Sequence, residues 1–261
     1  MAITTTNATS RGKKLQGKIA VITGGGSGIG ATTAALFIQE GATVLITGLH
    51  EAPLQKVADT LDPTGKQAFY AVQDVGSEEQ WLRIAAMLQE RFGRVDILVN
   101  NAGMTGNLLA PMAERSLTEF MQVLSTNLAG TFLGIKTLVP LMPPGSAIVN
   151  VSSIAGITGN AGANGYTASK GGSRLFSKGA AIELAKQGIR VNSLHPGYVE
   201  TPMVTQMEGS DSFRRMAIGS TPMGRGARAA ELATGILFLA GEDSSFMTGA
   251  ELIMDGGFTA F

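Results

Sequence analysis

The chain has 261 residues, with 20 Lys or Arg, 20 Asp or Glu and no Cys. Its formal charge of zero argues against a nucleic-acid binder, which usually carries a basic excess. The lack of cysteine excludes disulfides and thiolate ligands. No apolar run reaches the roughly 18 residues that a membrane span needs. Residues 1–14 are polar and lack the apolar centre of a secretory signal, so we expect a mobile tail and a cytoplasmic protein.

The first predicted element is a buried strand over Lys18–Ile22, which runs into a glycine-rich loop and then a helix over Ala31–Glu40. Strand, glycine loop and helix are the setting of a dinucleotide-binding fingerprint, in which main-chain N–H groups and the helix dipole hold phosphates. A triphosphate-binding loop needs Lys and Ser or Thr after its last glycine, and Ala31-Thr32 stand there instead. We expect the cofactor to contact Gly24, Gly26, Ser27, Gly28, Ile29 and Gly30.

The rest of the chain alternates apolar strand patterns with helical patterns and contains no linker or repeat. The further predicted strands are Thr43–Thr47, Gln67–Val72, Val95–Asn100, Ala147–Val151, Ile189–Leu194 and Glu251–Met254. The further predicted helices lie near 51–61, 77–92, 116–138, 165–187 and 229–240. This alternation predicts a single α/β domain over 15–261, with a Rossmann-type, doubly wound parallel sheet of about seven strands and helices on both faces.

A Tyr and a Lys stand four residues apart in YTASK, at Tyr166 and Lys170, and Ser153 lies thirteen residues before the tyrosine. On a helix, residues four apart share a face. A phenol has an ordinary pKa of about 10, and a cation beside it favours the phenolate and lowers that pKa. The arrangement predicts a site for proton transfer.

Six motifs occur in order: TGGGSGIG at 23–30, NNAG at 100–103, Asn127 in STNLAGTF, Ser153 in VNVSSIAG, YTASK at 166–170 and HPGYVETPM at 195–203. Together they resemble the short-chain dehydrogenase/reductase family, in its compact single-domain branch, over about residues 15–261. Within that family the chain is most similar to bacterial secondary-alcohol dehydrogenases and carbonyl reductases. Acyl-carrier-protein reductases and sugar or polyol dehydrogenases are close relatives and remain alternatives.

The resemblance implies an oxidoreductase that reduces a ketone to a secondary alcohol with NAD or NADP. It assigns catalysis to Asn127, Ser153, Tyr166 and Lys170. Tyr166 would donate the proton, Ser153 would hold the carbonyl oxygen, Lys170 would also bind the ribose, and Asn127 would hold a water that joins the lysine to solvent. The implied cofactor contacts are Asp74 and Val75 at the adenine, Asn101, Ala102 and Gly103 at the ribose, and Pro196, Gly197, Val199 and Thr201 at the nicotinamide.

Cofactor choice depends on the end of the second strand, where an Asp would bind a ribose 2′-hydroxyl and select NAD. This chain has Gly48 there, followed by Leu49 and His50. Nothing acidic opposes a 2′-phosphate and no arginine binds it. The sequence therefore favours NADP slightly and leaves use of both cofactors open.

The segment 202–223 covers the active site in the family and is rich in methionine, which adapts to irregular apolar shapes. We expect a lid over a bulky apolar or aromatic ketone, with substrate contacts from Ser153, Tyr166, Tyr198, Met203 and Met207. Arg214-Arg215 could instead receive an anionic acyl carrier.

The only histidines, His50 and His195, are far apart in sequence and show no ligand spacing, so we expect no catalytic metal. Some relatives bind a structural magnesium near the chain end, which here would involve the Phe261 carboxylate. Small residues on the helix 165–187 and the resemblance imply a homotetramer or homodimer.

The sequence disfavours two other classes of function. A non-catalytic sensor of redox cofactors is disfavoured by the intact Asn127, Ser153, Tyr166 and Lys170 set. An epimerase or dehydratase of the extended branch would need a substrate domain for which this chain has no room.

Overall fold

The computed structural model describes residues 12–108, 110–205 and 210–260. Within them, seven strands form one sheet in the order β3-β2-β1-β4-β5-β6-β7, and every neighbouring pair is parallel. The strands are β1 (Ile19–Thr23), β2 (Thr43–Gly48), β3 (Ala68–Val72), β4 (Ile97–Asn100), β5 (Ala147–Val151), β6 (Arg190–Pro196) and β7 (Glu251–Met254). The predicted doubly wound α/β fold is confirmed.

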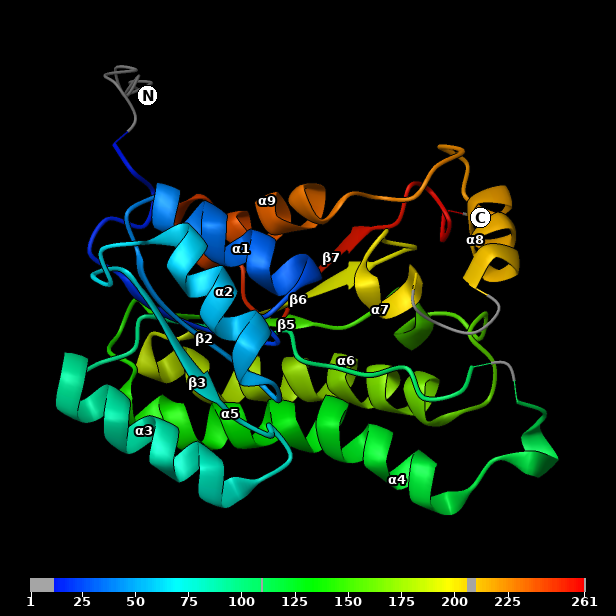
Figure 1. The fold of residues 1–261 in the computed structure, drawn as a ribbon, viewed down its shortest axis with the longest axis horizontal. Helices are drawn as coiled ribbons and strands as arrows, with labels where there is room; N and C mark the ends of the chain where they lie inside the picture. The colour runs from blue at the N-terminus through cyan, green and yellow to red at the C-terminus, as the bar shows by residue number, and fades with distance from the viewer. Residues whose placement is uncertain (1–11, 109, 206–209, 261) are drawn as a thin grey trace.

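Helices cover both faces of the sheet (Figure 1). One layer holds α1 (Gly28–Gln39), α2 (Glu51–Leu61) and α9 (Ala229–Ala240). The other holds α3 (Glu78–Phe92), α4 (Leu117–Leu124), α5 (Gly130–Leu138) and α6 (Gly165–Leu184). Two shorter helices, α7 (Pro202–Thr205) and α8 (Ser210–Gly219), lie toward the end of the molecule where β6 finishes. Single turns of 3₁₀ helix are η1 (Met112–Glu114), η3 (Val139–Leu141), η4 (Ile154–Gly156), η5 (Ala185–Gln187) and η6 (Glu242–Ser244).

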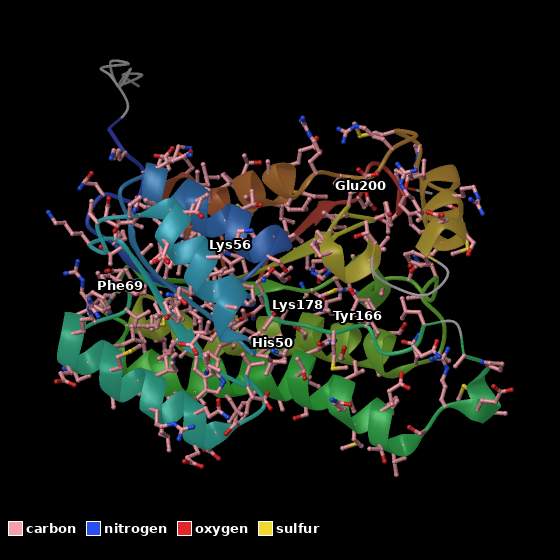
Figure 2. All side chains as sticks on the ribbon, viewed as in Figure 1. His50, Lys56, Phe69, Tyr166, Lys178 and Glu200 are labelled. Atoms are coloured by element: carbon pink, nitrogen blue, oxygen red, sulfur yellow. The ribbon has the colours of Figure 1, made fainter. Side chains whose placement is uncertain are left out.

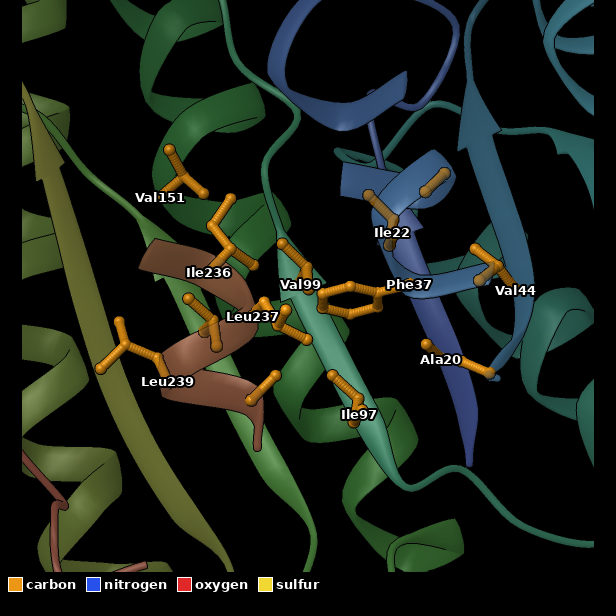
Figure 3. Close-up of a cluster of buried hydrophobic side chains, with 14 of the residues drawn as sticks. Ala20, Ile22, Phe37, Val44, Ile97, Val99, Val151, Ile236, Leu237 and Leu239 are labelled. Carbon is orange, nitrogen blue, oxygen red and sulfur yellow. The ribbon is translucent and has the colours of Figure 1, made fainter. Parts of the chain in front are cut away.

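Each face of the sheet buries its own hydrophobic core, because successive side chains of a strand point to opposite faces. Along β1, Ala20 and Ile22 join the core that also contains Phe37 of α1 and Ile236 of α9, and Figure 3 shows this cluster. Val21 points the other way, into the core beneath α3, α5 and α6. Ala20, Val21 and Ile22 are consecutive, apolar and fully buried, as expected of a parallel strand that is covered on both faces.

The chain from 116 to 138, predicted as one helix, is interrupted in the structure. Helix α4 ends at Leu124, the π-helical segment η2 (Ser125–Ala129) follows, and α5 begins at Gly130. Asn127 lies in the middle of η2 and is buried. Single π turns inside α-helices occur frequently at functional sites. The periodicity of apolar residues continues through this segment, so the sequence pattern did not reveal it.

The predicted tail, 1–14, falls mostly outside the described residues, but its last residue is held by the domain. The main-chain N–H of Lys14 donates to Glu40 Oε2 at 2.8 Å, and its ammonium pairs with Asp243. Leu15 is fully buried. In the described part of the chain, no helix combines the length and the apolarity that a membrane crossing requires.

Candidate active site

The glycine loop follows β1, next to β4, at the point where the strand order reverses. Ligands in open α/β sheets bind at such a switch point, outside the carboxyl ends of the strands. Gly24 and Gly28 have φ values of 66° and 54°, in the left-handed region that favours glycine. A Cβ on Gly30 would lie 2.3 Å from the Gly24 carbonyl oxygen. Glycine is therefore required at all three positions for the loop to close over the start of α1.

Helix α1 begins at Gly28, three residues earlier than predicted, so its amino end lies within the loop itself. Ser27 is the N-cap residue, and its side chain makes no capping hydrogen bond. The first turn has no acidic residue. Asn101, after β4, fixes the loop from the other side because its Nδ2 donates to the Thr23 carbonyl at 2.8 Å. The unpaired N–H groups and dipole at this end suit a phosphate.

A cavity of about 250 Å³ runs from this loop to the predicted catalytic residues. Its lining comprises Gly24, Ser27, Gly28, Ile29, Asn101, Ala102, Gly103, Val151, Ser152, Ser153, Tyr166, Lys170, Pro196, Gly197, Val199, Thr201, Pro202, Met203 and Val204. The structure thus brings Ser153, Tyr166 and Lys170 together with the residues expected to hold the nicotinamide. We name this space the catalytic cavity.

Ser153 and Tyr166 enter the catalytic cavity from the end of β5 and the start of α6. Ser153 begins η4, and its Oγ accepts from the Ala155 N–H at 3.1 Å. Asn164 caps α6 by accepting from the Thr167 N–H at 2.9 Å, which fixes the turn that carries Tyr166. Burial raises the pKa of Tyr166, and a hydrogen bond with the Ser153 side chain lowers it.

Lys170, one turn along α6 from Tyr166, is buried. Its Nζ donates to the Val151 carbonyl at 2.9 Å and lies 5.7 Å from the centre of the Tyr166 ring. Burial lowers the pKa of Lys170 to about 8, because the apolar surroundings disfavour the charged form. Burial has the larger effect on Tyr166, so its pKa is raised overall in this structure, and the lowering expected from Lys170 stays a prediction.

The Asn127 side chain is held by protein groups. Its Oδ1 accepts from the Met104 N–H at 2.8 Å, and its Nδ2 donates to the Met104 carbonyl and to Ser169 Oγ, each at 2.9 Å. Both amide protons are therefore used, and the side chain has only acceptor capacity left for a water. Its role in a water relay stays a prediction.

A second cavity, of about 520 Å³, adjoins the first and extends over the ends of β2 and β3. Its lining comprises Gly24, Gly26, Ser27, Gly48, Leu49, His50, Pro53, Leu54, Gln73, Asp74, Val75, Ala102, Gly103, Met104, Gln122, Ser125 and Thr126. We name it the nucleotide cavity. The two cavities share Gly24, Ser27, Ala102 and Gly103 in their lining, so one elongated ligand can occupy both.

The outer wall of the nucleotide cavity carries no fixed charge beyond Asp74. Leu49 is 62% exposed, and His50, at the start of α2, is also exposed (labelled in Figure 2). Asp74 Oδ1 accepts from the Gly76 N–H at 2.8 Å. Gln73, which our sequence analysis did not single out, is buried, and neither polar atom of its amide has a hydrogen-bond partner. Its only signal in the sequence is an amide directly before Asp74.

The residues expected to contact the substrate do not all lie at the catalytic cavity. Met203 lines the catalytic cavity, whereas Tyr198 does not: its ring packs against Phe213, 6.0 Å between centres, and lines a different cavity beside β7. Met207 lies outside the described residues. Arg214 pairs with Glu200 at 2.8 Å, so its charge is already compensated.

His195 is a second residue that sequence reasoning passed over. Its ring is fully buried, and Nδ1 lies 3.1 Å from the Ser153 carbonyl oxygen. The sequence offered one clue, the presence of a histidine directly before Pro196 at a strand end. Within the described residues, no group of three or more His, Asp or Glu side chains is placed to hold a metal ion. The suggested magnesium ligand, Phe261, lies outside those residues.

Comparison with known proteins gives consistent matches along nearly the whole chain. The family model described as enoyl-(acyl carrier protein) reductase matches residues 24–259. Cyclopentanol dehydrogenase of Comamonas sp. (strain NCIMB 9872) is 37% identical over 249 residues, covering 95% of this chain and 99% of the relative. The NADP-dependent (R)-specific alcohol dehydrogenase of Lentilactobacillus kefiri is 37% identical over 252 residues, covering 95% and 98%. The 3-oxoacyl-acyl-carrier-protein reductase of Thermotoga maritima is 38% identical over 247 residues, covering 94% and 98%.

Proposed function

The chain belongs to the short-chain dehydrogenase/reductase family, and on this basis we propose that it catalyses the reversible NAD(P)H-dependent reduction of a ketone to a secondary alcohol. One observation carries the proposal. Ser153, Tyr166 and Lys170 line the same cavity, and that cavity shares its wall with the glycine loop.

The residues present fit a nicotinamide dinucleotide. A Cβ on Gly24 would lie 2.9 Å from Ala102 Cα, so only glycine lets the loop pack closely against the segment after β4 and leave room for a dinucleotide. The orphaned amide of Gln73 lies beside the space that suits an adenine, which offers both donors and acceptors. When bound, the reduced cofactor supplies a hydride to the carbonyl carbon. The residues that would hold it are those of the two cavity linings, with Asp74 and Val75 at the adenine end and Pro196, Gly197, Val199 and Thr201 at the nicotinamide end.

In this mechanism Tyr166 donates its phenolic proton to the oxygen of the developing alkoxide, and it takes a proton back in the oxidative direction. Ser153 stabilises the same oxygen through a hydrogen bond from its hydroxyl. Lys170 holds positive charge behind the tyrosine and is fixed by Val151, so it favours the phenolate whenever it is protonated. Burial raises the pKa of Tyr166 and so favours the protonated phenol, the form that donates in the reductive direction.

The lining of the nucleotide cavity favours NADP slightly. Positions 48 to 50, at the end of β2, carry no acidic residue, so no carboxylate there repels a 2′-phosphate. No arginine or lysine lines this cavity either, so NADH is also expected to bind. One of the similar proteins carries NADP dependence in its name.

The substrate we propose is a bulky apolar or aromatic ketone. Met203 and Val204 of α7 line the catalytic cavity, and the segment 202–223 is proposed as the lid that covers it. The similar proteins named for cyclopentanol and for (R)-specific alcohol oxidation support an uncharged alcohol or ketone.

We further propose that the chain forms a homotetramer, since two separate sets of apolar side chains are exposed. Leu117 of α4 and Leu175 and Ile182 of α6 are 74%, 68% and 79% exposed. Phe246, after α9, is fully exposed, and Ile253 of β7 is 43% exposed. Exposed apolar side chains on α4 and α6, and others after α9 and on β7, suit two kinds of contact between identical subunits. Light scattering coupled to size exclusion tests this, and a monomer would contradict it.

The function is tested by following nicotinamide absorbance with NADPH and NADH in parallel, with an aryl alkyl ketone and cyclopentanone as acceptors. Consumption of either cofactor that depends on the ketone supports the proposal. A 3-oxoacyl thioester serves as the third acceptor, because the Thermotoga relative and the matching family model are named for acyl-carrier-protein reductases. Activity with the thioester but with neither ketone would show that the substrate is an acyl thioester and would contradict the proposed ketone substrate. Cofactor binding without turnover of any acceptor would contradict an enzymatic role.

A further inference from the structure

The main chain at Ser153 lies just beyond the last rung between β5 and β6. The paired strands end at Val151 and Leu194, and the Ser152 N–H then donates to the Leu194 carbonyl at 2.8 Å. Beyond this point the two segments diverge, because the chain after β5 turns into η4 while β6 continues to Pro196. The main-chain hydrogen bonds between β5 and β6 therefore end before Ser153.

The side chain of His195 spans this gap. Its Nδ1 lies 3.1 Å from the Ser153 carbonyl oxygen, and its ring is fully buried. The same carbonyl also accepts from the Gly156 N–H at 3.0 Å, inside η4. The carbonyl of Ser153 is thus held both by its own turn and by β6.

The partners of the ring determine where its proton sits. A carbonyl oxygen only accepts, so Nδ1 must carry the hydrogen. Ser193 Oγ lies 2.9 Å from Nε2 and 3.4 Å from the Ala250 carbonyl oxygen, so the nearer Nε2 is the better acceptor for its proton. Burial lowers the pKa of His195, and the hydrogen bond with the Ser153 carbonyl raises it by less. Of the charged groups around it, Glu251 raises that pKa and Arg174 and Lys170 lower it, and the neutral ring is the form that these surroundings favour.

We propose that His195 is a positioning residue for Ser153: its neutral ring, protonated on Nδ1, fixes the peptide that aims the Ser153 hydroxyl into the catalytic cavity. The contact joins residues 42 apart in sequence. With Ala155 N–H bonded to Ser153 Oγ at 3.1 Å, both ends of the serine are held, one by η4 and one through β6. His195 does not line the catalytic cavity and acts only through Ser153.

The spectroscopic test needs no substrate, and the chain is well suited to it because it has only two histidines. In ¹⁵N-histidine-labelled protein, long-range proton–nitrogen spectra distinguish the two tautomers and the charged form. A His50→Gln variant assigns the signals of the exposed His50 and so identifies those of His195. His195 should show a single Nδ1–H tautomer that does not change between about pH 5.5 and 8. An Nε2–H tautomer or a normal titration would overturn the proposal.

The kinetic test rests on the proposed function and uses three variants of His195. Asn places an amide donor near the position of Nδ1, Gln places one near Nε2, and Leu keeps the bulk without a donor. We expect His195→Leu and His195→Gln to lower kcat by about tenfold, since small misplacements of reacting groups are costly, and His195→Asn to recover most of that loss. The dissociation constant for the cofactor, measured by quenching of the fluorescence of Trp81, should stay within about twofold.

The outcomes separate the two hypotheses. If wild-type protein reduces no acceptor, the proposed function fails, while the tautomer spectrum still decides whether His195 holds Ser153. If the wild type is active and all three variants lose kcat equally, or the Leu variant loses none, the positioning role is wrong. If the Leu variant does not fold, the comparison of Asn with Gln decides alone, because both carry an amide and differ in reach.

Discussion

The catalytic cavity and the nucleotide cavity share a wall, yet they are built differently. In the catalytic cavity, Lys170 and Ser153 are both anchored. Lys170 donates to the Val151 carbonyl, and Ser153 is held by Ala155 and, through its carbonyl, by His195. At the outer end of the nucleotide cavity, Leu49 is exposed and the buried amide of Gln73 has no partner. The candidate catalytic side chains are fixed by several hydrogen bonds, whereas the residues that would select the cofactor make few contacts. Substitutions should therefore abolish turnover in the first cavity and shift preference or stability in the second.

The largest effect is expected from Tyr166→Phe, which removes the proton donor and little else. General acid catalysis contributes about 10²–10⁴-fold, so kcat should fall by that factor. Binding of NADPH, followed by fluorescence, should change little. A variant that kept more than about a tenth of the wild-type turnover would show that Tyr166 is not the acid.

Lys170→Met should also remove most of the activity but should stabilise the free protein below about pH 8. The folded-state pKa of Lys170 is lowered to about 8 from an ordinary value of 10.5, so the native state disfavours the charged lysine. The unfolded chain binds this proton more tightly, and wild-type stability therefore rises between about pH 8 and 10.5.

Urea unfolding of wild type and Lys170→Met at several pH values measures this difference. The advantage of the Met variant should be on the order of 3 kcal/mol near pH 7 and should disappear as the pH approaches 10.5. An advantage that is the same at both ends of this range would mean that lysine desolvation is not its source.

In the nucleotide cavity, Leu49→Arg should favour NADP over NAD by about tenfold, because an arginine there can pair with a 2′-phosphate. The ratio of kcat/KM for the two cofactors measures it. Leu49→Met, which adds length without charge, is the matched control and should leave the ratio unchanged. An unchanged ratio in the Arg variant would mean that position 49 does not face the phosphate.

The smallest effect is expected from Gln73→Met. A buried amide without a partner costs about 1–3 kcal/mol, and an apolar side chain of similar length avoids this cost. The free energy of unfolding of the variant, measured by urea denaturation, should be about 1 kcal/mol higher than that of the wild type. A less stable variant would show that the amide of Gln73 makes an essential contact within the folded protein.

Much of the fold followed from local patterns. The bounds of β5 and β7 agree with the predicted strands, because short β-branched runs between turns leave little choice of register or end. Helix α1 begins three residues early because main-chain geometry at Gly28, rather than apolar periodicity, sets its start. Apolar periodicity also fails to report the π turn at Asn127, because the apolar pattern of the helix runs through it unchanged.

The sequence by itself determined the glycine loop, the doubly wound parallel sheet implied by βαβ alternation, and the choice of Ser153, Tyr166 and Lys170 as candidate residues. These depend on spacing along one segment and on which backbone angles a residue type tolerates. Only the tertiary structure decided that His195 reaches Ser153, that Tyr198 turns away to Phe213, and that Gln73 is buried without a partner. Each of these depends on how side chains from distant segments meet after the sheet forms, and no local pattern encodes that meeting.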